Sequence, residues 1–348
     1  MRKLMRWCLL FLICFWASYQ VTQLLLANPT KIRSSGVGQQ SQLAKSLTNS
    51  DGATADLVGG NITKSPYVTN SKPKSENVTK RNIIFIELVN HSHWPAMTEC
   101  AVLSAARSNP DANILMYSVK LDYADSWKRH ANIQLIPLDI DKEFQTLKFS
   151  PGLQQRWNQT KASHYWRVQV ADIVRMVLLK NTPNAVYFDS DFMILRSIPA
   201  EWRNVIGLER NKLGNAFLGF QQDSVVLAEA LRRIPEFWSV ISRWGLSGMF
   251  LWKEVISSFI GPVIRAGQYK DVWVLPKKLL FPFHFYHFEL RNLFEPDKLE
   301  IARAMLNESI AMTIWRGTLE DRNITELPEG CMLRELFRTY CDMNVTKI

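Results

Sequence analysis

Two aspartates, Asp189 and Asp191, stand two residues apart directly after the apolar run Ala185–Phe188. Side chains alternate along a strand, so residues i and i+2 point the same way. Two converging carboxylates repel each other unless a cation lies between them, and hard oxygen ligands of this kind suit Mg²⁺ or Mn²⁺. The spacing therefore predicts a divalent-metal site that takes part in the chemistry just beyond a buried strand.

The same Asp-x-Asp pattern occurs a second time, at Asp139 and Asp141, after the strand-like run Ile133–Leu138. There it leads into Lys142 and Glu143, a charged stretch typical of a solvated helix start. The Asp189 pair instead follows a helix, a turn and a strand, which places it at the strand's carboxyl end, where ligands bind in open α/β sheets. The order of elements favours Asp189 and Asp191 as the site.

The helix that precedes this strand is predicted from about Ser163 to Lys180. Its apolar stripe recurs with the helical period and consists of Trp166, Val170, Ile173, Val174 and Val177. Asp172 and Arg175 share the opposite face. Two interpretations stay open: a surface ion pair that contributes a few tenths of a kcal/mol, or a pair that reaches a ligand beside the following strand.

Alternation of strands and helices sets the expected fold class. Strands are predicted at Asn82–Leu88, Asn113–Val119 and Asn132–Leu138, with a helix at Met97–Arg107 after the first. Strands and helices in this order form βαβ units. We expect an α/β fold whose Rossmann-type, mainly parallel sheet is flanked by helices.

The N-terminus carries membrane-targeting signals. Arg2, Lys3 and Arg6 precede an apolar segment that runs from Trp7 to Ala27. This pattern predicts a cytoplasmic tail (1–6), an uncleaved transmembrane signal anchor (7–27), a flexible lumenal stem (28–80) and a globular domain (81–348). A cleaved signal peptide is the alternative, disfavoured by Leu25 at the −3 position. Seven Asn-x-Ser/Thr sequons agree with a secretory-pathway protein: Asn61, Asn77, Asn90, Asn158, Asn307, Asn323 and Asn344.

The net charge of +10 is concentrated before the globular part. Residues 1–27 carry +3 and residues 28–80 carry +4, so only +3 remains for the chain from Arg81 onward. This near balance argues against a nucleic-acid partner. It leaves a basic stem, and one hypothesis is an extracellular protein that acts through this stem on sulfated glycans.

Five cysteines allow few cross-links. Cys8 and Cys14 lie in the predicted anchor, so Cys100, Cys331 and Cys341 form at most one disulfide between them. Cys331 and Cys341 are close in sequence and are a candidate pair, but the pairing stays open.

The motifs occur in a collinear pattern. Ala171–Arg175 and Val186–Asp191 together resemble the Asp-x-x-Arg … Tyr-x-Asp-x-Asp core of the DXD-containing α-1,4-glycosyltransferases. Gly214–Phe220 resembles the family's Asn-Gly-Ala-Phe-Leu segment, and Thr313–Trp315 with Leu336–Cys341 resembles its C-terminal end. The resemblance covers roughly residues 81–342.

This resemblance implies a GT-A fold and a single-pass type II protein of the Golgi membrane with a lumenal catalytic domain. It implies a retaining hexosyltransferase that uses a UDP-sugar and Mn²⁺. The acceptor would be a terminal galactose of a glycolipid or glycoprotein, joined through an α-1,4 linkage.

The resemblance also implies roles for individual residues. Asp189 and Asp191 match the carboxylates that bind the metal and the pyrophosphate, with Asp191 as the direct ligand. The positions matching donor-binding residues are Asp172, Arg175, Tyr187, Asn215 and Ala216. The region that would shape the acceptor site contains Gly248 and Trp315.

Three segments depart from the family pattern. Asn181–Ala185 replaces a Gly-Gly, which predicts a donor loop of different conformation because glycine permits torsions that Asn and Ala do not. Leu246–Met249 replaces a polar residue followed by Gly-Pro, and Thr313 replaces a His. These changes support a second hypothesis, a non-catalytic, membrane-anchored sugar-binding or chaperone-like relative. His284 and His287 have two interpretations, contact with a sugar or packing in a core loop.

Overall fold

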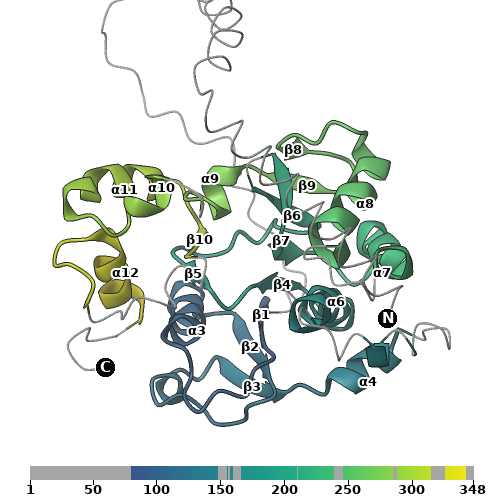
Figure 1. Cartoon of the computed structure of the whole chain (residues 1–348), viewed down its shortest axis with the longest axis horizontal. Helices are drawn as coiled ribbons and strands as arrows, with labels where there is room; N and C mark the ends of the chain where they lie inside the picture. Colours follow the sequence, from purple (N-terminus) through teal and green to yellow (C-terminus); the bar gives the residue numbers. More distant parts are fainter. Residues whose placement is uncertain are drawn as a thin grey trace, which may run out of the picture. The chain divides into compact units, whose positions relative to one another are not determined.

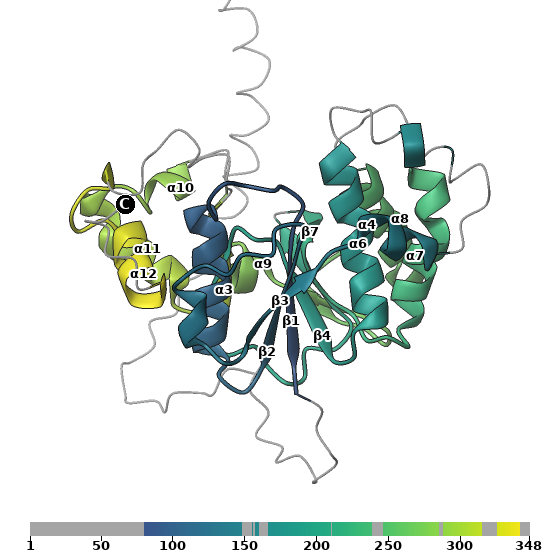
Figure 2. The same cartoon turned by 90° about the horizontal axis from the view of Figure 1, so that it is seen from below.

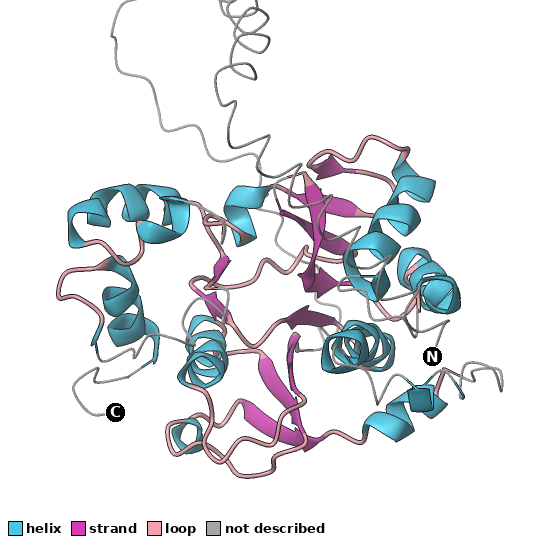
Figure 3. Cartoon of the chain, viewed as in Figure 1, coloured by secondary structure: helices cyan, strands magenta, loops and turns pink. Residues whose placement is uncertain are grey.

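The fold is built around an eight-stranded sheet with a shorter two-stranded sheet beside it (Figure 1, Figure 3). The computed structural model describes residues 80–147, 155, 157–159, 166–209, 211–238, 246–284, 288–314 and 326–341. They belong to one compact unit, Ser75–Ile348. The predicted tail, anchor and most of the stem lie outside the described residues. Within those ranges, no helix is both long enough and apolar enough to span a bilayer.

The strand order of the large sheet is β3-β2-β1-β4-β7-β6-β9-β8. The strands are β1 (Asn82–Glu87), β2 (Asn113–Ser118), β3 (Ile133–Pro137), β4 (Ala185–Phe188), β6 (Val205–Glu209), β7 (Lys212–Gly219), β8 (Gly267–Gln268) and β9 (Trp273–Leu275). The predicted strands are therefore present, with ends that differ by at most one residue, and so are the predicted helices α3 (Ala96–Ser108) and α6 (Trp166–Asn181). The predicted start of the second helix, Ser163, lies outside the described residues.

The prediction of a mainly parallel sheet is correct for six of the eight strands, whereas β7 and β8 run in the opposite direction. Strands β3, β2, β1 and β4 are parallel, but β7 is antiparallel to both β4 and β6. Only two residues separate β6 from β7, and such a short connection can join only antiparallel strands. The sheet is mixed.

Helices cover both faces of the sheet in three layers (Figure 2). Helix α3 (Ala96–Ser108) packs on one face, against residues such as Ile83 and Phe85. On the other face lie α6 (Trp166–Asn181), α7 (Val225–Phe237) and α8 (Leu251–Ile260), against Ile84 and Ile86. The alternation within β1 supplies apolar side chains to both faces, which explains why this strand is almost wholly buried.

The second Asp-x-Asp begins a helix, as predicted. Asp139 caps α4 (Ile140–Gln145) by accepting a hydrogen bond from the backbone of Lys142 at 3.1 Å. Asp141 accepts one from the Trp157 indole at 2.7 Å. Both carboxylates therefore serve local structure.

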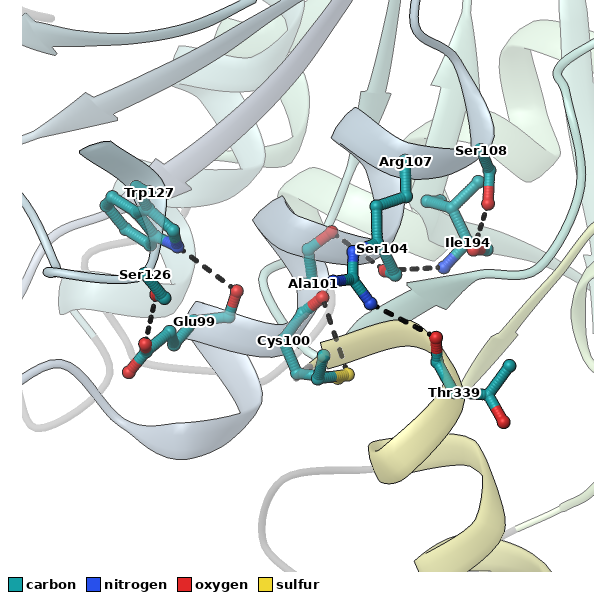
Figure 4. Close-up of a disulfide and its surroundings, with 11 residues drawn as sticks. Glu99, Cys100, Ala101, Ser104, Arg107, Ser108, Ser126, Trp127, Ile194 and Thr339 are labelled. Atoms are coloured by element: carbon teal, nitrogen blue, oxygen red, sulfur yellow. Dashed lines mark hydrogen bonds between the residues drawn. A yellow bond between two sulfur atoms is a disulfide. The ribbon is translucent and has the colours of Figure 1, made fainter. Parts of the chain in front are cut away.

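A smaller cluster packs beyond α3. It contains residues of the two-stranded sheet of β5 (Phe192–Ile194) and β10 (Ala311–Thr313), and of the helices α10 (Phe288–Arg291), α11 (Leu299–Leu306) and α12 (Met332–Cys341). The short helix α9 (Lys277–Leu280) packs with the α3 face of the large sheet. Cys341, at the end of α12, forms a disulfide with Cys100 of α3 (Figure 4). Cys331 stays a buried free thiol. Helix α12 separates Cys331 from Cys341 by about 15 Å, at 1.5 Å per residue, which is too far for a disulfide. The candidate pair Cys331–Cys341 is thus wrong.

Candidate active site

A cleft of about 390 Å³ opens at the carboxyl edge of the sheet, where β1, β4 and β6 end. The predicted site residues that the structure describes all line it: Asp172, Arg175, Tyr187, Asp189, Asp191, Asn215, Ala216 and Gly248. Thr313 lines it as well. Trp315 and His287 lie outside the described residues.

The two aspartates sit in the short turn between β4 and β5. The backbone N–H of Asp189 donates to the Ala216 carbonyl at 2.8 Å, and the N–H of Phe192 donates back to the Asp189 carbonyl at 3.0 Å. The N–H of Ile314 donates to the Asp191 carbonyl at 3.2 Å. One of these bonds closes the turn, and the other two fix it to β7 and to the segment that follows β10.

Arg175 lies at the centre of a buried charge network. One guanidinium nitrogen is 3.0 Å from Asp189 Oδ1 and another is 3.5 Å from Asp172 Oδ1. The guanidinium also donates to the Asn215 carbonyl and lies over the Tyr187 ring, 4.7 Å from its centroid. The Arg175 and Asp172 side chains are only 6% and 7% exposed. The interpretation of this pair as a surface ion pair is therefore wrong.

The network fixes the protonation states of its members. Burial raises the pKa of Tyr187 well above the ordinary value; the Arg175 charge opposes this rise and Asp189 adds to it. Burial by itself would lower the pKa of Arg175, but Asp189, Tyr187 and Asp172 raise it above the ordinary value. At physiological pH Tyr187 is thus a neutral O–H donor, and it donates to Asp189. Arg175 is a permanent cation on the same carboxylate.

An irregularity in β7 brings Asn215 and Ala216 to the cleft. Between the pairs Ile206–Leu218 and Leu208–Leu213, four residues of β7 face one residue of β6. Such bulges re-aim side chains beside active sites. The Asn215 amide nitrogen donates to Asp172 Oδ1 at 2.6 Å, and its oxygen accepts from the Trp252 indole at 2.8 Å.

Gly248 packs directly against this pair. It interrupts the π-helical turn η2 (Leu246–Phe250) with a non-helical backbone. A Cβ atom at Gly248 would lie 2.8 Å from Asn215 Nδ2 and 2.9 Å from Asp172 Oδ2. The predicted acceptor-region residue therefore contacts residues predicted to bind the donor.

The Asn181–Ala185 connection does not form a donor loop, contrary to the expectation from the missing Gly-Gly. It precedes β4, so it lies at the amino edge of the sheet, away from the cleft. Asn184 adopts a left-handed backbone there, with φ of 47°. Asparagine tolerates this conformation better than most residues, so the turn forms without the two glycines.

The Asp189 and Asp191 carboxylates suit a metal site whose remaining ligands come from a bound phosphate and water. Among the described residues, no group of three or more His, Cys, Asp or Glu side chains is placed to hold a metal ion by itself. Asp189 and Asp191 provide two hard-oxygen side chains in one cleft. Mg²⁺-type ions in nucleotide sites take one or two carboxylates and complete their shell with phosphate oxygens and water. The residues present fit such a cation.

Two cleft glutamates were missed in the sequence. Glu87 ends β1 and is 4% exposed, and Glu209 ends β6. Buried His284 lies 3.4 Å from Glu209 through its Nε2 atom. Each glutamate is the last residue of a strand, and Asp189 directly follows one. An acidic residue at a strand end is therefore the sequence feature that could indicate these two residues, but only the end of β4 carries a recognisable motif.

Comparison with known proteins identifies a class of enzyme. No protein-family model matches the chain. Its curated homologues are glycosyltransferases and support a hexosyltransferase. Lactosylceramide 4-alpha-galactosyltransferase of Pan troglodytes is 25% identical over 292 residues, which cover 79% of this chain and 80% of the relative. Alpha-1,4-N-acetylglucosaminyltransferase of Homo sapiens is 21% identical over 277 residues, 75% of this chain and 79% of the relative. The resemblance found in the motifs is thus confirmed.

Solved structures give weaker likenesses. The galactosyltransferase LgtC in complex with donor and acceptor sugar analogs matches 76% of this chain and 96% of its own, at 10% identity and a TM-score of 0.40. Mouse xyloside xylosyltransferase 1 matches 68% of this chain and 97% of its own, also at 10% identity and a TM-score of 0.40. Likenesses at this level decide nothing about the site.

Proposed function

We propose that the protein is a metal-dependent retaining glycosyltransferase that uses a UDP-sugar. It transfers a hexose or N-acetylhexosamine through an α-1,4 linkage to a terminal galactose of a glycolipid or glycoprotein. One observation carries the proposal: three elements, α6, the β4–β5 turn and β7, bring five polar side chains to one cleft at the sheet's carboxyl edge. These are Asp172, Arg175, Asp189, Asp191 and Asn215. The names of the curated homologues support the linkage and the acceptor.

In this proposal the charged residues act on the donor. Asp191, together with Asp189, would hold Mn²⁺ or a similar cation, which stabilises negative charge on the departing diphosphate when bound. Arg175 and Tyr187 fix the Asp189 carboxylate by charge and by hydrogen bond. Asp172 and Asn215 form a hydrogen-bonded pair suited to the hydroxyl groups of the donor.

The apolar part of the cleft wall would keep water from the activated sugar. It is lined by Ile86, Leu88, Val89, Val168, Ala171 and Met249. A site with such walls protects a reactive intermediate from hydrolysis and strengthens the electrostatic interactions inside it.

A Golgi membrane location with a lumenal catalytic domain belongs to the same proposal. The basic residues before Trp7 and the apolar segment up to Ala27 support it. So do the sequon residues Asn90, Asn158 and Asn307, which are exposed and accessible to glycosylation.

A second candidate is a sugar-binding relative without catalysis. The observation that favours it is Thr313, a residue 1% exposed that lines the cleft where the family pattern has a His. A neutral hydroxyl is a poorer ligand than imidazole. Metal-dependent UDP binding separates the candidates, because a degenerate site would show none.

The test uses the full chain, purified in detergent from a secretory cell line. UDP release is measured with Mn²⁺ and a panel of UDP-sugars, with and without lactose or lactosylceramide. We expect acceptor-dependent release with one donor. Well-folded protein that neither releases UDP nor binds it would exclude the enzyme.

The variant Asp191→Asn tests the site. We expect UDP release to fall at least about 100-fold, the order of losing a charge that acts in the transition state, with the yield of folded protein and its thermal stability unchanged. The matched control is Asp125→Asn, whose side chain is 96% exposed on the surface. Near-normal turnover in Asp191→Asn would refute the assignment.

A further inference from the structure

A second contact between ionisable side chains lies at the cleft wall and takes no part in the Arg175 network: Glu209 lines the cleft, and His284 contacts it from outside the lining. Glu209, the last residue of β6, lines the cleft, and its carboxylate lies 3.4 Å from His284 Nε2. The two side chains are 14% and 7% exposed. Such a buried contact adds little net stability when both groups are charged, because desolvation offsets the attraction. Its position on the cleft wall therefore suggests a role in binding.

Aromatic packing holds His284 beside Glu209. The ring of Phe281 lies against β6 and β7 at two glycines: a Cβ at Gly207 or at Gly214 would approach it to 2.7 or 2.8 Å. Phe281 is 1% exposed and follows α9, in which the Leu279 carbonyl accepts a hydrogen bond from the Ile310 N–H at 2.9 Å. The segment that carries His284 is thus fixed to the strand that carries Glu209.

The position of Glu209 along the cleft is set by strand order. The cleft follows the ends of β1, β4, β7 and β6, with Asp189 after β4. Glu209 lies two strands further, about 10 Å at 4.8 Å per strand. The β1 side offers Ile86, Leu88 and Val89, apolar walls suited to a nucleoside. The β6 side offers the Glu209 carboxylate, a group suited to sugar hydroxyls, with His284 in contact behind it.

We propose that Glu209 binds the hydroxyl groups of a neutral terminal hexose of the acceptor, and that His284 is a positioning residue that orients its carboxylate. This inference rests on the proposed function and adds a selection rule. A carboxylate accepts hydrogen bonds from two hydroxyls, and it repels a carboxylate on the ligand at close range. The cleft should therefore favour a neutral galactose over the same galactose bearing sialic acid.

Binding and turnover are measured on the full chain with UDP and Mn²⁺ present. The probes are lactose and 3′-sialyllactose. Saturation-transfer NMR measures the binding of each probe, and where turnover occurs the KM for lactose is measured as well. For Glu209→Ala we expect at least a tenfold weaker lactose affinity or higher KM, with the Kd for UDP within twofold of wild type. The isosteric Glu209→Gln should bind lactose better than Glu209→Ala and should narrow the preference for lactose over 3′-sialyllactose.

His284 is tested by rescue. His284→Ala should raise the KM for lactose at least threefold without changing the Kd for UDP, and His284→Gln, which keeps an N–H donor, should recover most of the loss. If His284 had only a structural role, its replacement would instead lower the thermal stability and weaken the binding of UDP and of lactose together. The controls are Glu254→Gln and His93→Ala, both exposed and neither of them a cleft-lining residue.

The outcomes separate this inference from the proposed function. Unchanged lactose affinity in Glu209→Ala would overturn the inference. A wild-type protein that binds UDP but not lactose would also overturn the inference, and it would leave the proposed donor site intact. A folded wild-type protein that binds neither would overturn the proposed function and this inference together.

Discussion

Arg175 shows why the site cannot be separated from the core. Its guanidinium is buried between Asp172 and Asp189 and lies on the Tyr187 ring. Removing one partner of a buried ion pair costs about 3–5 kcal/mol, since the remaining charge stays desolvated. The residues that would bind the donor therefore also stabilise the contact between α6 and the sheet.

The absence of a side chain at Gly248 lets its backbone lie close to the Asp172 and Asn215 side chains. A Gly248→Ala methyl group would come within 2.9 Å of both Asp172 and Asn215. Overpacking of this kind costs about 1–3 kcal/mol, so we expect the Kd for UDP, measured by calorimetry, to rise roughly 5- to 150-fold. Gly267→Ala is the control, since its nearest neighbour would be 3.6 Å away. Equal UDP affinity in both variants would show that Gly248 has no such role.

At the scale of elements, β4 and its flanking turns decide where chemistry happens. Its first turn, with Asn184 in a left-handed conformation, lies at the amino edge and only connects α6 to the sheet. Its second turn carries Asp189 and Asp191 and is fixed by backbone bonds to β7 and to Ile314, which follows β10. A change of sequence in the first turn is therefore tolerated, because it touches no cleft residue.

The disulfide fastens α12 to α3 across 241 residues of sequence. Cross-links over long loops restrict the unfolded chain, and their loss typically costs 2–5 kcal/mol. The double variant Cys100→Ala with Cys341→Ala should lower the unfolding temperature in a calorimetric scan by several degrees. Its UDP affinity at 25 °C should not change, because neither cysteine lines the cleft.

Cys331→Ala is the matched variant for this experiment. It removes a buried thiol that has no disulfide partner, so its unfolding temperature should respond to reductant as that of the wild type does. A double variant as stable as the wild type under non-reducing conditions would show that the cross-link does not stabilise the fold.

At the scale of the whole molecule, the globular part has its own core. Among the described residues, the three clusters of buried side chains begin at Ile83 and together reach Cys341. We therefore expect a chain that starts at Ser75 to unfold cooperatively and to bind UDP with the affinity of the full chain. Circular dichroism and calorimetry check both points, and a non-cooperative transition would show that residues 1–74 contribute to folding.

The sequence by itself determined what depends on local patterns. Apolar periodicity located β1, α3 and α6, and the order helix, turn, strand and acid placed Asp189 and Asp191 at a strand's carboxyl end. The charged stretch after Asp141 identified the other Asp-x-Asp as a helix start. Collinear motifs gave the relationship to glycosyltransferases, which the homologues confirm. These features follow from neighbours within a few residues, where propensity and side-chain direction are legible.

The tertiary structure alone decided what depends on distant partners. The burial of Asp172 and Arg175 comes from Asn215 and Gly248, which lie on β7 and η2. Cys100 finds Cys341 because α12 packs on α3, and Glu209 meets His284 because Phe281 fills the space above two glycines. Such contacts join residues 40 or more positions apart. Strand order and helix packing bring them together, and no local pattern in the sequence encodes that order.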